Sequence, residues 1–154
     1  MLRDRLNAAL KDAMRAKDQR RVSTIRLILA AVKDRDIAGR SEESREGVPD
    51  EEILQILSKM IRQRQDSIEA YEKADRMELA AQEREEIQVI ESFQPPQLSE
   101  QDIHKACAEA VEQVEAKGLK DMGRTMAVLK ERYAGLMDFS KASAIVKNML
   151  SGQD

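Results

Sequence analysis

The sequence predicts an all-α protein with two multihelical domains. Apolar residues recur at intervals of three and four along nearly the whole chain, the spacing that places one stripe on a helix. No alternation of apolar and polar residues lasts more than a few positions, which argues against strands. We therefore expect about four helices bundled in an N-terminal domain, residues 1–94, and a small three-helix bundle in a C-terminal domain, residues 97–154.

Two helices account for the first 38 residues. The first begins at Leu2 and should end near Lys17, after which Asp18 can cap the second through its side-chain oxygen. The second helix stops before Gly39. Its apolar residues are nearly continuous over residues 27–32, so we expect it to be the central helix of the N-terminal bundle.

A polar connection, two further helices and a boundary follow. Residues 39–49 are polar, bounded by glycines and closed by a proline, which is typical of an exposed connection. Asp50 opens a third helix of about two dozen residues, and a fourth, which carries Leu79, Glu83, Ile87 and Ile90, runs until Pro95-Pro96. Pro95-Pro96 cannot continue that helix, because a proline disfavours helical geometry in the residue before it. The domain boundary is expected there.

The last three helices are predicted from their ends. Ser99 is an N-cap in a variant of the capping box, and Gly118 is expected to end the helix that it starts. Asp121 starts the sixth helix and Gly135 ends it. Asp138 then caps the seventh.

Composition excludes several classes of protein. A chain of 154 residues and 17.5 kDa can fold without a disulfide or a metal. Its single cysteine excludes an internal disulfide and fits a reducing compartment, so we expect a cytoplasmic location. Charges in the first turns rule out an uninterrupted apolar signal core, and no run approaches the roughly 18 apolar residues of a membrane span. We expect no membrane association.

Charge is unevenly distributed although the net value is only −3. Residues 1–40 hold eleven Lys or Arg against five Asp or Glu, residues 41–96 seven against fifteen, and residues 97–154 eight against nine. A basic first third could approach a polyanion, because screening makes local charge matter more than the total. We favour the simpler interpretation, a solvated pair of helices.

Side chains that could perform catalysis are few. His104 and Cys107 lie three residues apart, but Cys107 falls on the apolar stripe of its helix and is expected to be structural, with His104 at the surface. The acidic group Glu83, Glu85 and Glu86 is interpreted as a solvated helix surface. The six glycines are too scattered to cradle a phosphate chain. We expect no catalytic residue, metal, cofactor or small-molecule substrate.

The segment Lys120-Asp121-Met122-Gly123-Arg124 is the most informative stretch of the chain. It places a helix cap, a bare backbone position and two cations within one turn. Asp121 can accept hydrogen bonds from the free N–H groups that open the next helix, while Gly123 allows another backbone or a phosphate to approach closely. Lys120 and Arg124 stand beside that position.

Two other cationic features lie in the first domain. Lys17, Arg20 and Arg21 cluster at a helix junction and form the second candidate for binding RNA. Arg26 lies within the most apolar helix and must either extend to solvent or find a carboxylate. We favour a structural salt bridge.

Four blocks of sequence, taken together and in order, resemble the GatB/YqeY family. They are Ser23-Thr24-Ile25-Arg26; Arg62-Gln63-Arg64-Gln65-Asp66-Ser67-Ile68 with Tyr71 and Lys73-Ala74; Pro95 with Gln97-Leu98-Ser99-Glu100; and Lys120-Asp121-Met122-Gly123-Arg124, with Gly135 and Asp138 downstream. The resemblance spans residues 2–150 and suggests a stand-alone YqeY-like protein. It implies that residues 97–154 are similar to the tail domain of GatB, a helical appendage that helps to engage tRNA, whereas amide transfer belongs to other domains.

The chain departs from the family pattern at two places. Asp75 stands where the family often has glycine, and Ala134-Gly135-Leu136 stands where a Lys-Gly-Arg cluster is frequent. The last loop is therefore less basic. Phosphate contacts on the C-terminal domain would have to come from other cations, namely Lys117, Lys120, Arg124, Lys130 and Arg132. Aromatic stacking platforms are few, so any RNA binding should depend on shape and salt.

Three functions remain open from sequence. The leading hypothesis is a non-catalytic cytoplasmic module that associates with tRNA. The second is a protein-interaction adaptor that docks on a translation or amidotransferase component, through either the Met-rich C-terminal bundle or the acidic middle helices. The third is an accessory part of a carbon–nitrogen ligase with glutamine as amide donor. Independent ligase activity is not expected, because the sequence shows neither a nucleophile–base pair nor a phosphate loop.

Overall fold

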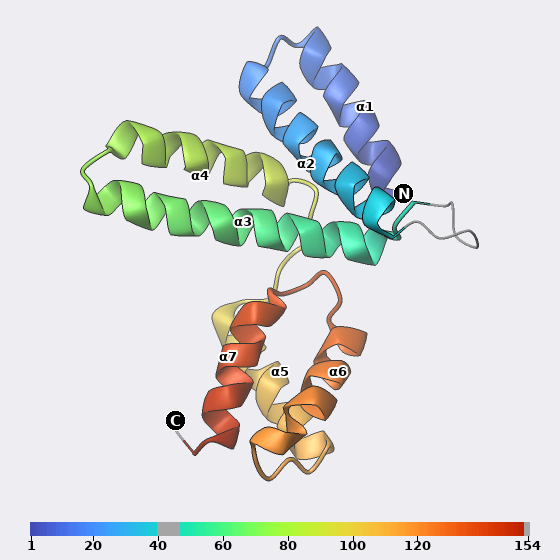
Figure 1. Ribbon diagram of the computed structural model, residues 1–154, viewed down its shortest axis with the longest axis vertical. Helices are drawn as coiled ribbons and strands as arrows, with labels where there is room; N and C mark the ends of the chain where they lie inside the picture. The colour runs from blue at the N-terminus through green and yellow to red at the C-terminus, as the bar shows by residue number, and fades with distance from the viewer. Residues whose placement is uncertain (40–46, 153–154) are drawn as a thin grey trace. The chain divides into compact units, whose positions relative to one another are not determined.

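The computed structural model describes residues 1–39 and 47–152, and every regular element in those ranges is a helix (Figure 1). The prediction of an all-α fold is confirmed. The chain divides into two compact units, Met1–Gln94 and Pro95–Asp154, each with its own apolar core.

The first unit consists of four helices. They are α1 (Leu2–Arg15), α2 (Gln19–Ala38), α3 (Asp50–Lys73) and α4 (Met77–Glu91). Figure 1 shows α1 and α2 as one antiparallel pair and α3 and α4 as another. The fully buried side chains of the core come from all four helices: Leu6, Ile25, Ile28, Val32, Ile53, Leu57 and Ile90. α2 packs against each of the other three, so its central position is confirmed.

The predicted cap of α2 is confirmed, and the helix buries only one face. The Asp18 carboxylate accepts a hydrogen bond from the Arg21 N–H at 3.2 Å, which caps the helix as expected. The continuous apolar run, however, is not buried all round, because Leu27 remains 48% exposed. A helix buries one face, and Ile28 and Val32 already occupy the face of α2 that meets the core.

Three helix ends are tied together beside the 39–49 connection, of which residues 40–46 lie outside the described residues. The Asp36 carboxylate accepts two hydrogen bonds from Arg3, at 2.8 and 2.9 Å, and one from the Val48 N–H at 2.8 Å. The Asp50 carboxylate accepts from the Leu2 N–H at 3.2 Å. The start of α1, the end of α2 and the start of α3 are therefore held at one place.

An ion-pair network joins α2, α3 and α4, and it corrects the prediction that the acidic group of α4 is solvated. The Arg64 Nε lies 2.9 Å from the Glu86 carboxylate, and both side chains are mostly buried. Arg20 reaches the same Glu86 at 3.7 Å and Glu85 at 3.2 Å. Burial, and then the charge of Glu86, raise the pKa of Glu83.

The second unit contains α5 (Glu100–Gln113), a short 3-10 turn η1 (Leu119–Asp121), α6 (Met122–Arg132) and α7 (Phe139–Leu150). The three α-helices contact one another pairwise around a core that includes Cys107, Leu129, Ala142 and Val146. The caps are confirmed: the Ser99 hydroxyl accepts from the Asp102 N–H at 3.1 Å, and the Asp138 carboxylate accepts from the Ser140 N–H at 2.9 Å.

The two helix ends expected at glycines in the second unit are wrong. α5 ends at Gln113, before Gly118, and the chain turns at Glu115 with φ 53°. α6 ends at Arg132, and Gly135 lies in the following turn with φ 77°. The Gly135 carbonyl accepts a hydrogen bond from the Gln97 side chain at 2.8 Å, which fastens this turn to the start of the unit.

Three helices end with a non-glycine residue in the left-handed region. These residues are Lys17, Asp75 and Glu115, with φ between 53° and 58°. After each of them the chain makes the backbone hydrogen bond of a Schellman turn, for example from the Arg76 N–H to the Tyr71 carbonyl at 2.8 Å. Position 75, where the resemblance implies glycine, is thus a position at which an L side chain is strained.

We expect Asp75→Gly to raise the free energy of unfolding by about 1 kcal/mol, because glycine adopts positive φ without a steric penalty. The control is Ala70→Gly in the exposed interior of α3, which should lower the same quantity by about 1 kcal/mol. Urea denaturation measures both. A destabilised Asp75→Gly variant would contradict the proposed strain.

A second prediction concerns the α2–α3–α4 network. Glu86→Ala leaves the mostly buried Arg64 without its carboxylate and should lower the free energy of unfolding by about 1–3 kcal/mol. Glu85 also pairs with Arg20, as Glu86 does, but the Glu85 side chain is exposed. Glu85→Ala should therefore change the free energy of unfolding by less than about 1 kcal/mol. Equal losses of unfolding free energy in the two variants, measured by urea denaturation, would contradict a larger contribution from the buried pair.

Candidate nucleic-acid interface

Asp121 organises the junction between α5 and α6. Its side chain is 11% exposed, and one carboxylate oxygen accepts from the Lys117 N–H at 2.9 Å while the other accepts from Arg124 Nη2 at 2.8 Å. The hydrogen bond from the Lys117 backbone, and then that from Arg124, hold the pKa of the Asp121 carboxyl below its usual range. The loop before α6 and the first turn of α6 are thereby joined through one charged group.

The predicted cap at Asp121 is wrong in its chemistry although right in its position. Asp121 is the N-cap residue of α6, but its carboxylate accepts no hydrogen bond from the first N–H groups of that helix. The preceding η1 turn already supplies the Met122 N–H with a backbone acceptor, the Leu119 carbonyl. The carboxylate accepts from the Lys117 N–H and from Arg124 instead, and the buried Thr125 hydroxyl donates to the Asp121 carbonyl at 2.9 Å.

Gly123 is exposed in the first turn of α6. Outside its own helical turn, no described atom lies within 4 Å of the position that a Cβ would take. The close approach expected there is therefore not made by another part of the described chain. The backbone at Gly123 is therefore accessible, and two exposed cations, Lys120 and Arg124, lie beside it in the sequence.

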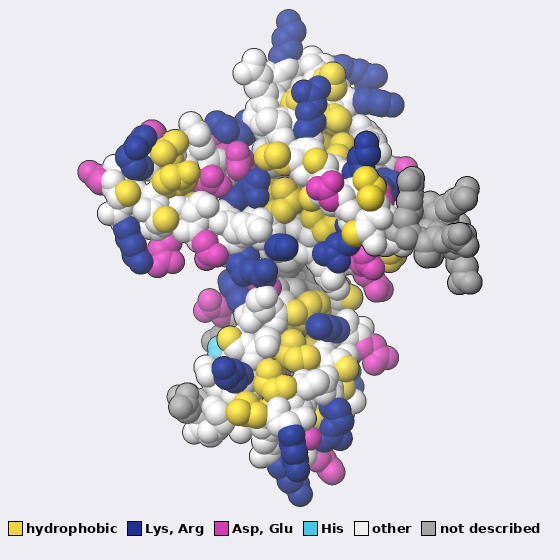
Figure 2. Space-filling model, viewed as in Figure 1, with side chains coloured by type: hydrophobic (Ala, Val, Ile, Leu, Met, Phe, Trp, Pro, Cys, Tyr) yellow, Lys and Arg dark blue, Asp and Glu magenta, His cyan; other side chains and the backbone are white. Residues whose placement is uncertain are grey.

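The five cations predicted for this unit do not form one surface. Lys117, Lys120 and Arg124 are exposed around Asp121, and Figure 2 shows Lys and Arg side chains, with Asp and Glu among them, where α5 leads into α6. Lys130 and Arg132 lie near the other end of α6. At about 100° per residue they project about 160° apart, with Glu131 nearly in line with Arg124. We call Lys117, Lys120 and Arg124 the junction cations.

At the second candidate surface, the turn between α1 and α2, two of the three predicted cations are engaged by other side chains. Arg20 is engaged by two carboxylates of α4, as described above. The Arg21 guanidinium stacks on the Phe93 ring, 5.3 Å from its centroid. Lys17 is exposed at the turn and has no ion pair with any described residue.

The salt bridge predicted for Arg26 is wrong. Its side chain is exposed and pairs with no carboxylate within residues 1–39 and 47–152. The neighbouring Ile25 and Ile28 point into the core, which leaves Arg26 on the opposite, solvated side of α2. Arg26 therefore follows the other outcome considered from the sequence, in which its side chain extends to solvent.

The single cysteine and the single histidine are not arranged as a catalytic pair. Cys107 is fully buried, its Sγ lies 3.8 Å from the Ala142 carbonyl, and burial raises the pKa of its thiol. A nucleophilic cysteine requires the opposite shift. His104 is exposed on the same helix, as expected. Among the described residues, no three His, Cys, Asp or Glu side chains gather as they would to hold a metal ion.

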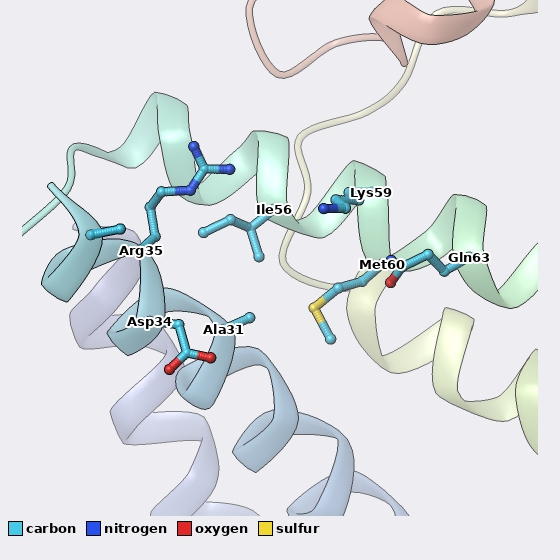
Figure 3. A pocket seen from close by; sticks show the side chains of 8 residues that line it. Ala31, Asp34, Arg35, Ile56, Lys59, Met60 and Gln63 are labelled. Atoms are coloured by element: carbon cyan, nitrogen blue, oxygen red, sulfur yellow. The ribbon is translucent and has the colours of Figure 1, made fainter.

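A groove of about 370 Å³ between α2 and α3 was not predicted. Its lining includes two exposed cations on different helices, Arg35 and Lys59, the carboxylate Asp34, and the apolar side chains Ile56 and Met60. Figure 3 shows the Arg35 side chain extending from α2 toward α3. Helical periodicity could have marked these cations as exposed, but only the pairing of α2 with α3 brings them together.

Comparison with known proteins places the chain in a family. A family model described as "Yqey-like protein" matches residues 3–150. Relatives named "Altered inheritance of mitochondria protein 41, mitochondrial" include that of Lachancea thermotolerans, 37% identical over 64% of this chain and 51% of that protein. The protein of that name from Pyrenophora tritici-repentis is 29% identical over 83% of this chain and 71% of its own length.

The chain spans about half the length of several of these relatives. The matched share is 46% in the Kluyveromyces lactis protein and 51% in that of Lachancea thermotolerans. Their names place those proteins in mitochondria, whereas the cytoplasmic location expected for this chain stays a prediction. None of the helices in the described ranges has the length and apolar character needed to cross a bilayer.

The lowered pKa of Asp121 predicts a pH-dependent contribution to stability. A carboxyl whose pKa is depressed in the folded state stabilises the fold above its unfolded value of about 3.9, and this is lost as pH falls through the lower folded pKa. Asp121→Asn should therefore lower the melting temperature at pH 7, and the difference from the unsubstituted protein should shrink in acid. Glu109→Gln, at an exposed position of α5, is the control and should change little.

Proposed function

The chain belongs to the YqeY-like protein family, and we propose that it is a non-catalytic module that binds tRNA through the junction cations of its second unit. The observation that carries the proposal is the arrangement around Asp121, which fixes Arg124 while leaving its side chain 62% exposed. A guanidinium has five N–H donors, and Asp121 engages one of its nitrogens. The other donors are available to phosphate oxygens.

Local charge and shape support a phosphate-binding surface. Asp121 offsets one of three positive charges, and Gly123 presents bare backbone beside them. Glu115 is also exposed nearby in sequence and reduces the attraction. A surface of a few cations without aromatic platforms binds a phosphate backbone by counterion release and distinguishes partners by shape.

A role without bond-making is supported by the state of the two candidate nucleophilic groups. The Cys107 thiol is buried with a raised pKa, and the exposed His104 lies on the same helix without activating it. The hypothesis of an accessory carbon–nitrogen ligase therefore draws support only from family resemblance. For the isolated chain we expect no amidated tRNA.

The adaptor hypothesis draws less support from the Met-rich bundle than from the acidic middle helices. The methionines of the second unit pack against or within its core, and they are Met122, Met126, Met137 and Met149. Met137 is buried and the other three are partly buried, so a Met-rich docking face there would expose only part of each of those three side chains. A tRNA-independent partner remains compatible with the first unit, and pulldown after nuclease treatment separates the two functions.

The experiment is a titration of the full chain with tRNA at several salt concentrations. Replacing both Lys120 and Arg124 with Ala should weaken binding and reduce the slope of log affinity against log salt by about 2, or about 1 for each cation that no longer meets a phosphate. The matched control replaces Lys130 and Arg132, which also removes two cations of α6. It should reduce the slope less, because those two side chains project apart.

Two measurements keep the result interpretable. Arg124→Lys retains the positive charge and should bind tRNA more tightly than Arg124→Ala. Thermal unfolding of each variant checks that the connection between α5 and α6 remains folded. Binding that is unchanged in the Lys120 and Arg124 double variant would reject the junction as the interface. Equal losses of affinity in both double variants would show a diffuse charge effect instead of a site.

A further inference from the structure

A groove between the end of α1 and the first half of α2 plays no part in the proposed tRNA surface. It has a volume of about 450 Å³, and its surface is mostly apolar. The residues that line it are Met14, Lys17, Gln19, Val22, Ser23 and Arg26. All of them belong to the first unit, whereas the junction cations belong to the second.

The apolar part of the groove is accessible. Met14 is 51% exposed although the adjacent Ala13 is buried in the core, and Val22 is half-buried. Single exposed apolar side chains are common on protein surfaces, but Met14 lines a groove that is mostly apolar. Its flexible thioether side chain can adapt to an apolar group inserted beside it.

The charged part of the groove has one sign. Lys17 and Arg26 are its only charged lining residues, and neither forms an ion pair with any residue in the described part of the chain. The nearest carboxylate in sequence, Asp18, is engaged in capping α2. The groove therefore combines an apolar floor with two cations that nothing in the described residues neutralises.

Lys17 occupies a position that is unfavourable for a lysine. Its φ of 58° lies in the left-handed region, which is sterically unfavourable for an L residue and not for glycine. The side chain gains no described ion pair in return. Its charge stands at the end of the groove and is available to an external carboxylate.

We propose that this groove binds an acidic amphipathic helix of a partner protein. An apolar side chain of that helix covers Met14 and Val22, and carboxylates on its flanks approach Lys17 and Arg26. Charge complementarity selects an acidic partner, and the apolar floor selects a peptide over a nucleic acid. Phosphates would leave Met14 and Val22 uncovered, and no aromatic ring among the described lining residues could stack on a base.

The test uses the full chain and a displayed library of random peptides about 16 residues long, enough for about four helical turns. Selected peptides should combine apolar residues at helical spacing with Asp or Glu, and they should shift the NMR signal of the Met14 methyl group. Fluorescence anisotropy then gives affinities for one selected peptide. Replacing Lys17 by Gly together with Arg26→Gln should weaken its binding about tenfold.

Two features of the variants exclude misfolding as the cause of such a loss. Lys17→Gly relieves the positive φ while removing the charge, so it should raise the melting temperature. Lys33→Gln removes an exposed cation of α2 that does not line the groove, and it should leave the affinity unchanged. Variants at Lys120 and Arg124 should also bind the peptide normally, which makes this test independent of the proposed tRNA surface.

Several results would overturn the proposal. They are selected peptides without acidic residues, an affinity that ignores the loss of Lys17 and Arg26, and a Met14 signal that responds to tRNA and not to peptide. Self-association of the chain that shifts the Met14 signal would identify a second copy as the occupant and would equally reject a partner helix.

Discussion

A charged side chain that is largely removed from water must be paired, and this constraint decides how helices are joined in both units of the protein. In the first unit, Glu86 is held between helices by Arg64 and Arg20. In the second, Asp121 is held by the Lys117 backbone and by Arg124. Leaving either carboxylate without partners would cost more than the pair gains, so the positions of the helices and the positions of the arginines are fixed together.

The same pairing decides which cations can act on other molecules. Arg20 and Arg21 are basic in sequence, yet one is engaged by carboxylates and the other by an aromatic ring. Arg124 is paired too, but its partner lies inward and leaves its outer donors exposed. An arginine of this second kind is better suited to bind an anion than a free lysine, because its side chain is already ordered before the anion arrives.

Local signals in the sequence predict where helices begin better than where they end. Asp18, Ser99 and Asp138 cap helices as expected, because a cap depends on a side chain and a backbone only two or three residues apart. The end near Lys17 was predicted without a glycine, whereas the end at Glu115 was expected at Gly118 and occurs earlier, because an ordinary residue adopts positive φ there. Whether Glu86 and Arg26 are paired depends on which helices become neighbours, and local patterns in the sequence do not show this.

Net charge by segment is therefore a poor guide to the local charge of this protein's surface. The first forty residues carry the largest positive excess, but part of it neutralises the acidic helix α4 within the same unit. Residues 97–154 are almost neutral in sum, yet Lys117, Lys120 and Arg124 surround one carboxylate that is turned inward. A phosphate at the surface experiences the charges within about one Debye length, roughly 10 Å, and not the total of the segment. The nearly neutral unit accordingly exposes a local group of cations, because its carboxylate Asp121 is turned inward.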